Sequence, residues 1–305
     1  MTKFRLTRTY LAVPAHRTRL VESAAASDAD AVFLDLEDAV PPGEKVAALR
    51  SAAEALSGLD WGRKSVAVRI NALDSATVAQ EVATLPGIER LDAVIVPKAE
   101  RLEEIEALAG RLAIGRLATG RARPLEIELM IETALGLVNV ERLVALPAVT
   151  ALHLGVGDFA ASIGARSPGI GVSPPGYRHV AEGGEAVPLD LFAYPMMRLL
   201  VAARAYDLRA IDGPCGSFRD LNATAAAADK AAAMGFDGKQ VIHPTQIAPT
   251  RVAFVPSDDE VAGARRIVAA MEQAEREGKG AVTVDGKMID YANLRMVRRL
   301  LRFAD

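Results

Sequence analysis

The stretch Ala31-Val32-Phe33-Leu34-Asp35-Leu36-Glu37-Asp38 decides the fold class, because a buried-type apolar run leads directly into acidic residues. An apolar run without in/out alternation is typical of a parallel strand that is covered on both faces. Comparable runs recur along the whole chain, and we expect strands at Tyr10–Val13, Ala31–Leu34, Ser65–Ile70, Asp92–Val96, Glu126–Ile131, Ala151–Leu154, Leu208–Ile211 and Gln240–Ile242.

Segments rich in Ala and Leu, with helical spacing of their apolar residues, separate most of these runs. Strands that alternate with helices pair in parallel through βαβ units. Eight such units predict a closed (β/α)₈ TIM barrel better than an open doubly wound sheet, and we assign residues 1–255 to this catalytic barrel. The helical segments are Thr18–Ser27, Glu44–Ser57, Ser75–Leu85, Leu102–Leu112, Asn222–Met234 and a helix at about Leu189–Tyr206.

Two stretches depart from the alternation. Gly164–Val187 is rich in Gly, Pro and Ser, and predicts either a functional loop at the barrel mouth or a flexible surface insertion. Residues 256–305 predict a lid or oligomerisation extension. In that extension, a capping box of Ser257 and Glu260 starts a helix to about Arg276. A hairpin (Ala281–Val284 and Lys287–Ile289, turning at Asp285-Gly286) and a helix over Tyr291–Phe303 complete it.

Composition excludes several classes of protein. The 305 residues carry a formal net charge of −3, whereas a general nucleic-acid binder is normally basic. The single cysteine, Cys215, allows neither an intrachain disulfide nor a CxxC metal site, and we read it as inert. No apolar stretch approaches the ~18 residues of a membrane span. Because Met1–Tyr10 also lacks the apolar core of a signal peptide, we expect a cytoplasmic protein with no membrane association.

Ionisable side chains follow most of the predicted strands, and active sites of such barrels lie at the carboxyl ends of the strands. We therefore expect one shared polar site. The residues concerned are Asp35, Glu37, Asp38, Arg69, Asn71, Lys98, Glu132, Asp158, Asp212 and His243.

Glu132 and Asp158 are the candidate metal ligands, because they follow neighbouring strands and would project into one mouth. Two carboxylates with few other ligands suit Mg²⁺, which keeps several waters. The alternative is that each carboxylate caps the helix that follows it. Zinc fits less well, because the four histidines are scattered and His153 lies within a predicted strand as a packed core residue.

Arg69 is the candidate anion clamp for a substrate carboxylate or an enolate oxygen. The alternative is a salt bridge to Glu37 or Asp38, and both roles are compatible. Lys98 invites a Schiff-base role, but surrounding carboxylates would keep it charged, so we favour a structural or electrostatic one. The basic run Arg295–Arg302 has the spacing of an ordinary solvated helix face.

Together these motifs resemble the citrate lyase β-subunit-like family of the HpcH/HpaI aldolase group, close to malyl-CoA and citramalyl-CoA lyases. The resemblance covers nearly the whole chain in order, except Gly164–Val187. The matching segments are Phe33–Val40, Val68–Asn71, Val96–Lys98, Ile131–Ala134 with Gly136, Gly157–Phe159, Gly235–Lys239, Ile242–Pro244 with Gln246-Ile247, and Gly286–Asp290.

The resemblance implies a barrel that assembles as a homotrimer or hexamer, with Glu132 and Asp158 as ligands of Mg²⁺, or of Mn²⁺ in its place. It implies that Arg69, together with Gly157 and Asp158, contacts the substrate. Glu37 and Asp38 would hold metal-bound water. Asp290 would lie on a C-terminal lid that reaches the site of a neighbouring subunit and would move the proton at carbon.

The implied reaction is the reversible cleavage of a 3-hydroxyacyl-CoA thioester into an acyl-CoA and a 2-oxo acid. CoA, as part of the thioester, needs basic groups for its phosphates, and the candidates are Arg8 and Arg17, with Arg5 and Arg19 beside them. The alternative is that these arginines have an ordinary surface role.

Several alternatives remain open. The chain could be the β-chain of a citrate lyase complex that acts on an acyl-carrier-protein thioester. It could be a CoA-independent 2-oxo acid aldolase, although that branch usually places a histidine base where this chain has acids. It could be a non-enzymatic CoA-binding subunit. A thioesterase would share every residue named above.

Overall fold

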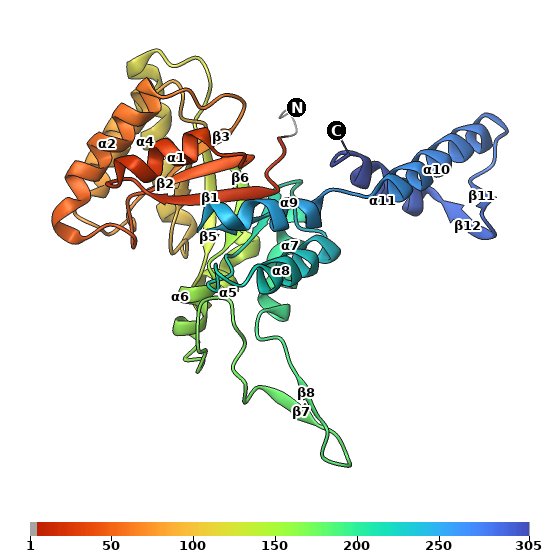
Figure 1. Ribbon diagram of the computed structural model, residues 1–305. Coiled ribbons are helices and arrows are strands. Elements are labelled where there is room, and N and C mark those ends of the chain that lie inside the picture. The colour runs from red at the N-terminus through yellow and green to blue at the C-terminus, as the bar shows by residue number, and fades with distance from the viewer. Residues whose placement is uncertain (1–4, 305) are drawn as a thin grey trace. The chain divides into compact units, whose positions relative to one another are not determined.

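The computed structural model describes residues 5–304, and a closed barrel of eight parallel strands forms the core of the unit that ends at Thr250 (Figure 1). Its strands follow one another in the order β1-β10-β9-β6-β5-β4-β3-β2, which closes when β2 pairs with β1. The predicted TIM barrel and all of its strands are confirmed. The barrel strands are β1 (Thr9–Pro14), β2 (Ala31–Asp35), β3 (Ser65–Arg69), β4 (Ala93–Val96), β5 (Glu126–Ile131), β6 (Val149–Leu154), β9 (Arg209–Asp212) and β10 (Gly238–Val241).

Helices connect consecutive barrel strands, as parallel pairing requires. Helix α4 runs past the predicted end at Leu112 to Thr119, where Gly120 adopts a left-handed conformation with φ of 72° and caps it. The helices of this part of the chain are α1 (Thr18–Ala26), α2 (Lys45–Gly58), α3 (Val78–Thr84), α4 (Leu102–Thr119), α5 (Ala134–Leu143), α6 (Val156–Ser162), α7 (Ala193–Ala205), α8 (Leu221–Met234) and α9 (Ile247–Phe254), with 3₁₀ turns at Pro42–Glu44, Leu85–Gly87 and Pro244–Gln246.

Side chains fill the barrel interior, so the barrel is a packed core and not a pore. An apolar cluster includes Tyr10, Phe33, Ile95 and Met130. His153 is fully buried there, as expected of a core histidine, and its Nε2 lies 2.7 Å from Oε2 of Glu128. Burial disfavours the charge on Glu128, but nearby Arg209 and His153 outweigh that effect and lower the pKa of Glu128 to about 2.

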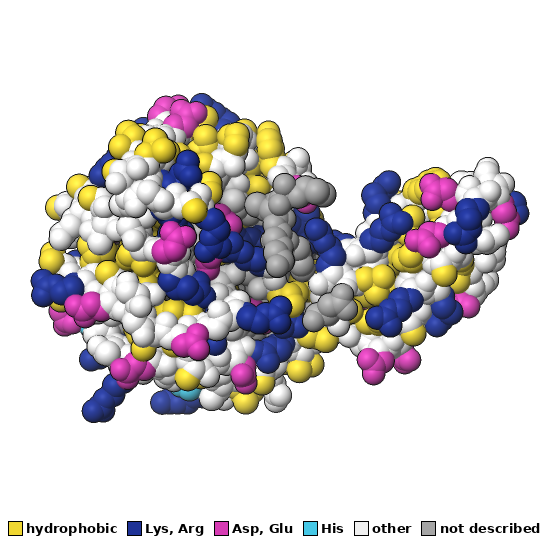
Figure 2. Space-filling model, turned by 90° about the horizontal axis from the view of Figure 1, so that it is seen from above, with side chains coloured by type: hydrophobic (Ala, Val, Ile, Leu, Met, Phe, Trp, Pro, Cys, Tyr) yellow, Lys and Arg dark blue, Asp and Glu magenta, His cyan; other side chains and the backbone are white. Residues whose placement is uncertain are grey.

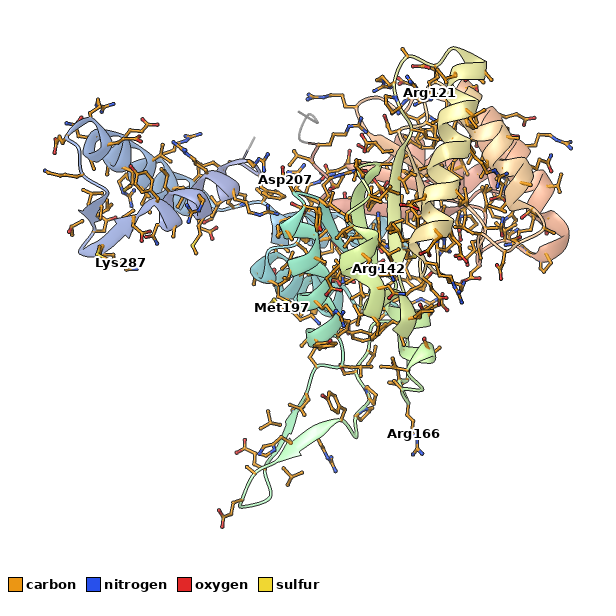
Figure 3. The ribbon with its side chains drawn as sticks, turned by 180° about the vertical axis from the view of Figure 1, so that it is seen from behind. Arg121, Arg142, Arg166, Met197, Asp207 and Lys287 are labelled. Carbon is orange, nitrogen blue, oxygen red and sulfur yellow. The ribbon has the colours of Figure 1, made fainter. Side chains whose placement is uncertain are left out.

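The segment between α6 and α7 contains a hairpin, where the sequence predicts a loop or a flexible insertion. Strands β7 (Arg178–Val180) and β8 (Ala186–Pro188) pair antiparallel, and every residue in them is exposed. The hairpin projects from the barrel (Figure 1), and Arg166 extends from the preceding loop into solvent (Figure 3). At its base the Ser173 hydroxyl accepts a hydrogen bond from the backbone N–H of Leu191.

A second compact unit begins within α9, between Thr250 and Arg251, slightly before the predicted boundary after residue 255. Its longest helix, α10 (Asp258–Arg276), starts with the predicted capping box of Ser257 and Glu260. The predicted hairpin is present as β11 (Ala281–Val284) and β12 (Lys287–Asp290), and α11 (Tyr291–Leu301) follows. Buried Met271, Ile289 and Leu294 form the core of this unit.

Charges of both signs are interspersed over the face of the barrel seen in Figure 2, rather than gathered into a basic surface. This distribution agrees with the formal net charge of −3. Within the part of the chain that the structure describes, no helix is both long and apolar enough to cross a membrane.

Candidate active site

Five neighbouring strands place charged side chains at the same end of the barrel. Asp35 is the last residue of β2, Arg69 is the last of β3, and Lys98 follows β4. Glu132 comes directly after β5, and Asp158 lies in the first turn of α6, after β6. Because parallel strands share a direction, these ends meet at one mouth.

Asp35 is the principal partner of Arg69. The two residues pair across β2 and β3, and Arg69 donates from Nε and Nη2 to the two carboxylate oxygens of Asp35 at 2.7 and 2.6 Å. Arg69 Nη1 also lies 3.2 Å from Glu37, which is one of the two ion pairs anticipated from the sequence. The sequence analysis does not predict the pairing of Arg69 with Asp35. A usable signal was present, because Asp35 and Arg69 are each the last residue of adjacent strands.

Asp35 also organises the loop that follows it. Its carboxylate accepts hydrogen bonds from the backbone N–H groups of Glu37 and Ala39 at 2.9 and 3.1 Å. Burial alone would raise the pKa of Asp35, but the hydrogen bonds from Arg69 and from this backbone lower it. Asp35 is therefore a charged, fully engaged group that holds both Arg69 and the loop carrying Glu37 and Asp38.

Glu132 is a buried carboxylate, 2 % exposed, that accepts a 2.8 Å hydrogen bond from the backbone N–H of Lys98. Burial is the main cause that raises its pKa to about 8, and the negative charge of Glu37 adds to it, while Arg69 opposes it. The alternative that Glu132 caps the next helix is wrong, because the Thr133 side chain caps α5 by accepting from Gly136 N–H.

Asp158 is the more accessible carboxylate, with 41 % of its side chain exposed. The N-cap residue of α6 is Gly155, and it makes no side-chain capping bond, so the alternative that Asp158 caps this helix is also wrong. Gly157 precedes Asp158, and a Cβ built there would meet only Ile170, at 3.7 Å. A side chain at Gly157 would thus make an ordinary van der Waals contact with Ile170 and no steric clash.

Lys98 links the acidic groups of the site. Its ammonium bonds to Glu37 and lies 3.4 Å from Asp38 and 3.8 Å from Asp158. Burial favours the neutral amine, but the hydrogen bond to Glu37 and the surrounding carboxylates outweigh burial and raise the pKa of Lys98 well above its ordinary value. A permanently charged ammonium is a poor Schiff-base nucleophile, in agreement with the electrostatic role that we favoured.

The oxygen atoms of Glu132 and Asp158 make the best candidate metal site. Within residues 5–304, no group of three or more His, Cys, Asp or Glu side chains is arranged to hold a metal ion. A pair of carboxylates, one buried with a raised pKa and one open to solvent, provides hard oxygen donors and room for water. This donor set fits Mg²⁺ better than it fits zinc.

Several residues singled out in the sequence lie outside this cluster. Arg8 precedes β1, at the opposite end of the barrel strands, and pairs with Asp30 at 2.8 Å. Arg17 does follow the carboxyl end of β1 and is exposed as the N-cap residue of α1. Asp212 is buried against Lys239 at 2.5 Å. The geometry therefore supports Arg17, but not Arg8, as a contact for a ligand at the mouth.

Three other residues serve local structure. The Asn71 side chain donates to Glu81 at 2.5 Å, and His243 Nδ1 lies 2.8 Å from the Thr245 hydroxyl. Asp290 belongs to the second unit and caps α11, where its carboxylate accepts from the N–H groups of Ala292 and Asn293. This cap provides a structural role for Asp290 that any functional test must preserve.

Gly155 is required for the position of Glu132. A Cβ at this residue would lie 2.3 Å from Oε2 of Glu132. We expect Gly155→Ala to lower the free energy of unfolding by ~1–3 kcal/mol, because the clash is with a buried side chain that has little room to move. Urea unfolding measures the effect.

Gly110→Ala is the matched control, since a Cβ there meets nothing within 4 Å and Ala favours a helix. If Gly155→Ala were as stable as Gly110→Ala, the close approach of Gly155 to Glu132 would not constrain the site.

A closed (β/α)₈ barrel with acid and guanidinium groups at the carboxyl ends of its strands is the architecture of the barrel enzymes. Within that class, residues 8–244 match the model of the HpcH/HpaI aldolase/citrate lyase family. The chain belongs to this family, in agreement with the resemblance seen in its motifs.

Similar proteins span nearly the whole chain. An L-malyl-CoA/beta-methylmalyl-CoA lyase of Cereibacter sphaeroides is 37 % identical over 295 residues, covering 96 % of this chain and 92 % of that protein. A (3S)-malyl-CoA thioesterase of the same species is 32 % identical, covering 98 % and 94 %. Among solved structures, CitE of Mycobacterium tuberculosis in complex with magnesium, acetoacetate and coenzyme A is 30 % identical, with a TM-score of 0.75 and 98 % of each chain covered.

Proposed function

We propose that this protein is a Mg²⁺-dependent carbon–carbon lyase that reversibly cleaves a 3-hydroxyacyl-CoA thioester of the malyl-CoA or citramalyl-CoA type into an acyl-CoA and a 2-oxo acid. The observation that carries the proposal is the pair Glu132 and Asp158, neither of which caps its helix, beside a guanidinium held by Asp35. The similarity to a lyase acting on L-malyl-CoA and to a CitE structure containing magnesium and coenzyme A supports the same assignment.

In this proposal, Glu132 and Asp158 hold the Mg²⁺, which when bound supplies a Lewis acid for oxygens of the substrate. Breaking the bond between C2 and C3 turns the C3 hydroxyl into the carbonyl of the 2-oxo acid, with its proton released to water, and leaves the electron pair on the acyl thioester as its enolate. Arg69, fixed by Asp35, stabilises that negative charge. Gly157, which precedes Asp158 in the chain, contacts the substrate, and Glu37 and Asp38 position water next to the ligands. Arg17 contacts the CoA phosphates.

Four finer points belong to the proposal. The proton at carbon moves to or from Asp290, contributed by a neighbouring copy of the chain. The assembly is a homotrimer or hexamer, and the protein works in the cytoplasm. Residues 1–255 form the catalytic domain and residues 256–305 an extension for the lid and for assembly.

Thioester hydrolysis is the second candidate function, because a (3S)-malyl-CoA thioesterase is 32 % identical over nearly the full chain. It would use the same metal ligands and a water in place of carbon–carbon cleavage. The products separate the two reactions: a lyase releases acyl-CoA and a 2-oxo acid, whereas a thioesterase releases free CoA and a hydroxy acid.

The first experiment is mass spectrometry of purified protein incubated with Mg²⁺, a panel of acyl-CoAs and glyoxylate, pyruvate or oxaloacetate. We expect a condensed CoA product that disappears when EDTA removes the metal. Malyl-CoA is incubated with the protein in a parallel reaction, and free CoA together with malate as its products would favour the thioesterase. Failure with every pair, together with turnover of an acyl-carrier-protein thioester, would favour a citrate lyase β-chain.

Asp290→Asn is expected to reduce kcat by ~10²–10⁴-fold, the usual contribution of a general acid or base. Asparagine is as good an N-cap residue as aspartate, so the substitution removes the titratable group while α11 keeps its cap. Steady-state kinetics measure the loss, and circular dichroism checks that the helix content is unchanged. Asp290→Ser, which also caps a helix, should lose activity equally.

Mixing the inactive Asp290→Asn protein with inactive Glu132→Gln protein tests whether Asp290 acts in a neighbouring copy. Mixed assemblies would contain some sites with both groups intact, so we expect activity to return after subunit exchange. Absence of recovery in assemblies shown by native mass spectrometry to be mixed would contradict the arrangement.

A further inference from the structure

Lys98 has a backbone conformation that only its surroundings can maintain. Its φ of 47° lies in the left-handed region, which is unfavourable for a residue with a Cβ. Strain of this kind persists where neighbouring contacts over-determine it, and it concentrates at functional sites. The conformation has a visible result, because it turns the Lys98 backbone N–H toward Glu132 and the side chain toward Glu37.

The two ends of Lys98 therefore act on different parts of the metal site. Its backbone N–H fixes the Glu132 carboxylate at 2.8 Å and cannot leave without refolding the strand end. Its ammonium contacts Glu37, Asp38 and Asp158 through a flexible four-carbon stem, with 36 % of the side chain exposed. The charge can move, whereas the hydrogen bond cannot.

The Lys98 ammonium is the cation of this cluster that faces the Asp158 carboxylate. Arg69 is already committed to Asp35 and Glu37. The remaining positive charge that reaches toward Asp158 in this cluster is the Lys98 ammonium. Lys45 is the other nearby cation, and it donates to the backbone carbonyls of Leu36 and Glu37, not to the carboxylates.

We propose that the Lys98 ammonium is a built-in counter-cation that occupies the acidic site in the metal-free protein and competes with the divalent metal for it. Two cations within a few ångströms repel each other strongly in a partly buried site. Metal binding therefore has to move the ammonium away from Asp158, toward the exposed Asp38 carboxylate. The inference rests on the proposed metal site, and in it the Lys98 ammonium weakens metal binding instead of strengthening it.

Removing the charge should tighten metal binding and weaken the metal-free fold. We expect Lys98→Met, which keeps the backbone N–H to Glu132, to bind Mn²⁺ at least about tenfold more tightly than wild type. Its unfolding temperature should be lower than wild type without metal, and Mn²⁺ should raise that temperature by more than it does for wild type. Free Mn²⁺ measured by electron paramagnetic resonance gives the affinity, with no need for substrate or turnover.

The controls separate this inference from the metal assignment. Lys98→Arg keeps the charge and should bind Mn²⁺ within about threefold of wild type. Lys98→Gln is a second neutral variant should Lys98→Met fail to fold. Mn²⁺ binding that is lost in Glu132→Gln but unchanged or weaker in both neutral Lys98 variants would overturn the competition alone. No binding by wild type or by either neutral Lys98 variant would overturn the metal site and the competition together.

Discussion

Glu132→Gln is expected to abolish metal-dependent cleavage, with a fall of at least ~10³-fold in kcat/KM, about 4 kcal/mol of transition-state stabilisation. Glutamine fills the same space, and its amide oxygen can accept the hydrogen bond from the Lys98 backbone N–H. The substitution nevertheless replaces the Glu132 carboxylate by a neutral amide, and a hard cation such as Mg²⁺ requires the negative charge of the carboxylate. Mn²⁺ binding should be lost in parallel, which isothermal calorimetry measures.

The stability of this variant separates lost chemistry from lost folding. The pKa of Glu132 is raised to about 8 in the metal-free folded state, so between pH of about 4.5 and 8 the folded state keeps a proton that the unfolded state has lost. The free energy of unfolding of wild type therefore falls as the pH rises through this range. Glutamine carries no such cost, so Glu132→Gln without metal should be at least as stable as wild type at pH 8, with no gain below pH ~4.5.

Glu104→Gln removes a carboxylate that is 49 % exposed on α4 and should leave metal affinity and activity unchanged. Full metal-dependent activity in Glu132→Gln would refute the assignment of this residue as a ligand. Asp158→Asn tests the second ligand in the same way.

Arg69→Lys is expected to lower kcat by ~10²–10³-fold, the usual loss when one positioned charge donor is removed from a developing oxyanion. Lysine retains the charge but cannot make the two-point contact through which Asp35 holds the guanidinium at 2.7 and 2.6 Å. The ammonium would therefore not be held where charge develops. Steady-state kinetics with a 3-hydroxyacyl-CoA substrate measure the loss.

Asp35→Asn should produce part of the same loss, because it releases Arg69 without removing it. The double variant, Asp35→Asn with Arg69→Lys, should lose less than the product of the two single effects, as expected for residues that act as a unit. Mn²⁺ affinity should stay within about threefold of wild type in Arg69→Lys, since the ligands are untouched. Wild-type kcat in Arg69→Lys would show that bidentate placement of the charge is not needed.

Local patterns were sufficient for the elements of the fold. Most barrel strands are apolar runs that are buried on both faces, so the signal lies in consecutive residues, as in Glu126–Ile131, where predicted and observed bounds agree. The capping box of Ser257 and Glu260 is likewise a local motif of four consecutive residues, and the structure contains it. The β7–β8 hairpin was missed because its short strands are exposed and lie in a segment rich in Gly and Pro.

The charged residues at the ends of the barrel strands, Arg69, Lys98, Glu132 and Asp158 among them, were all found from the sequence alone. Strand direction fixes which end of the barrel they share, and the sequence records that direction. The same rule, applied to Arg8, would have placed it at the opposite end, because it precedes β1.

The sequence by itself determined the barrel, the family and the set of charged residues at its mouth, because strand and helix periodicity and strand-end position are local properties. Only the tertiary structure decided which of those charges are paired. Asp35 binds Arg69, and the Lys98 ammonium reaches the carboxylates across the mouth. Such pairings depend on distances between side chains from different strands, and these distances exist only once the barrel has closed.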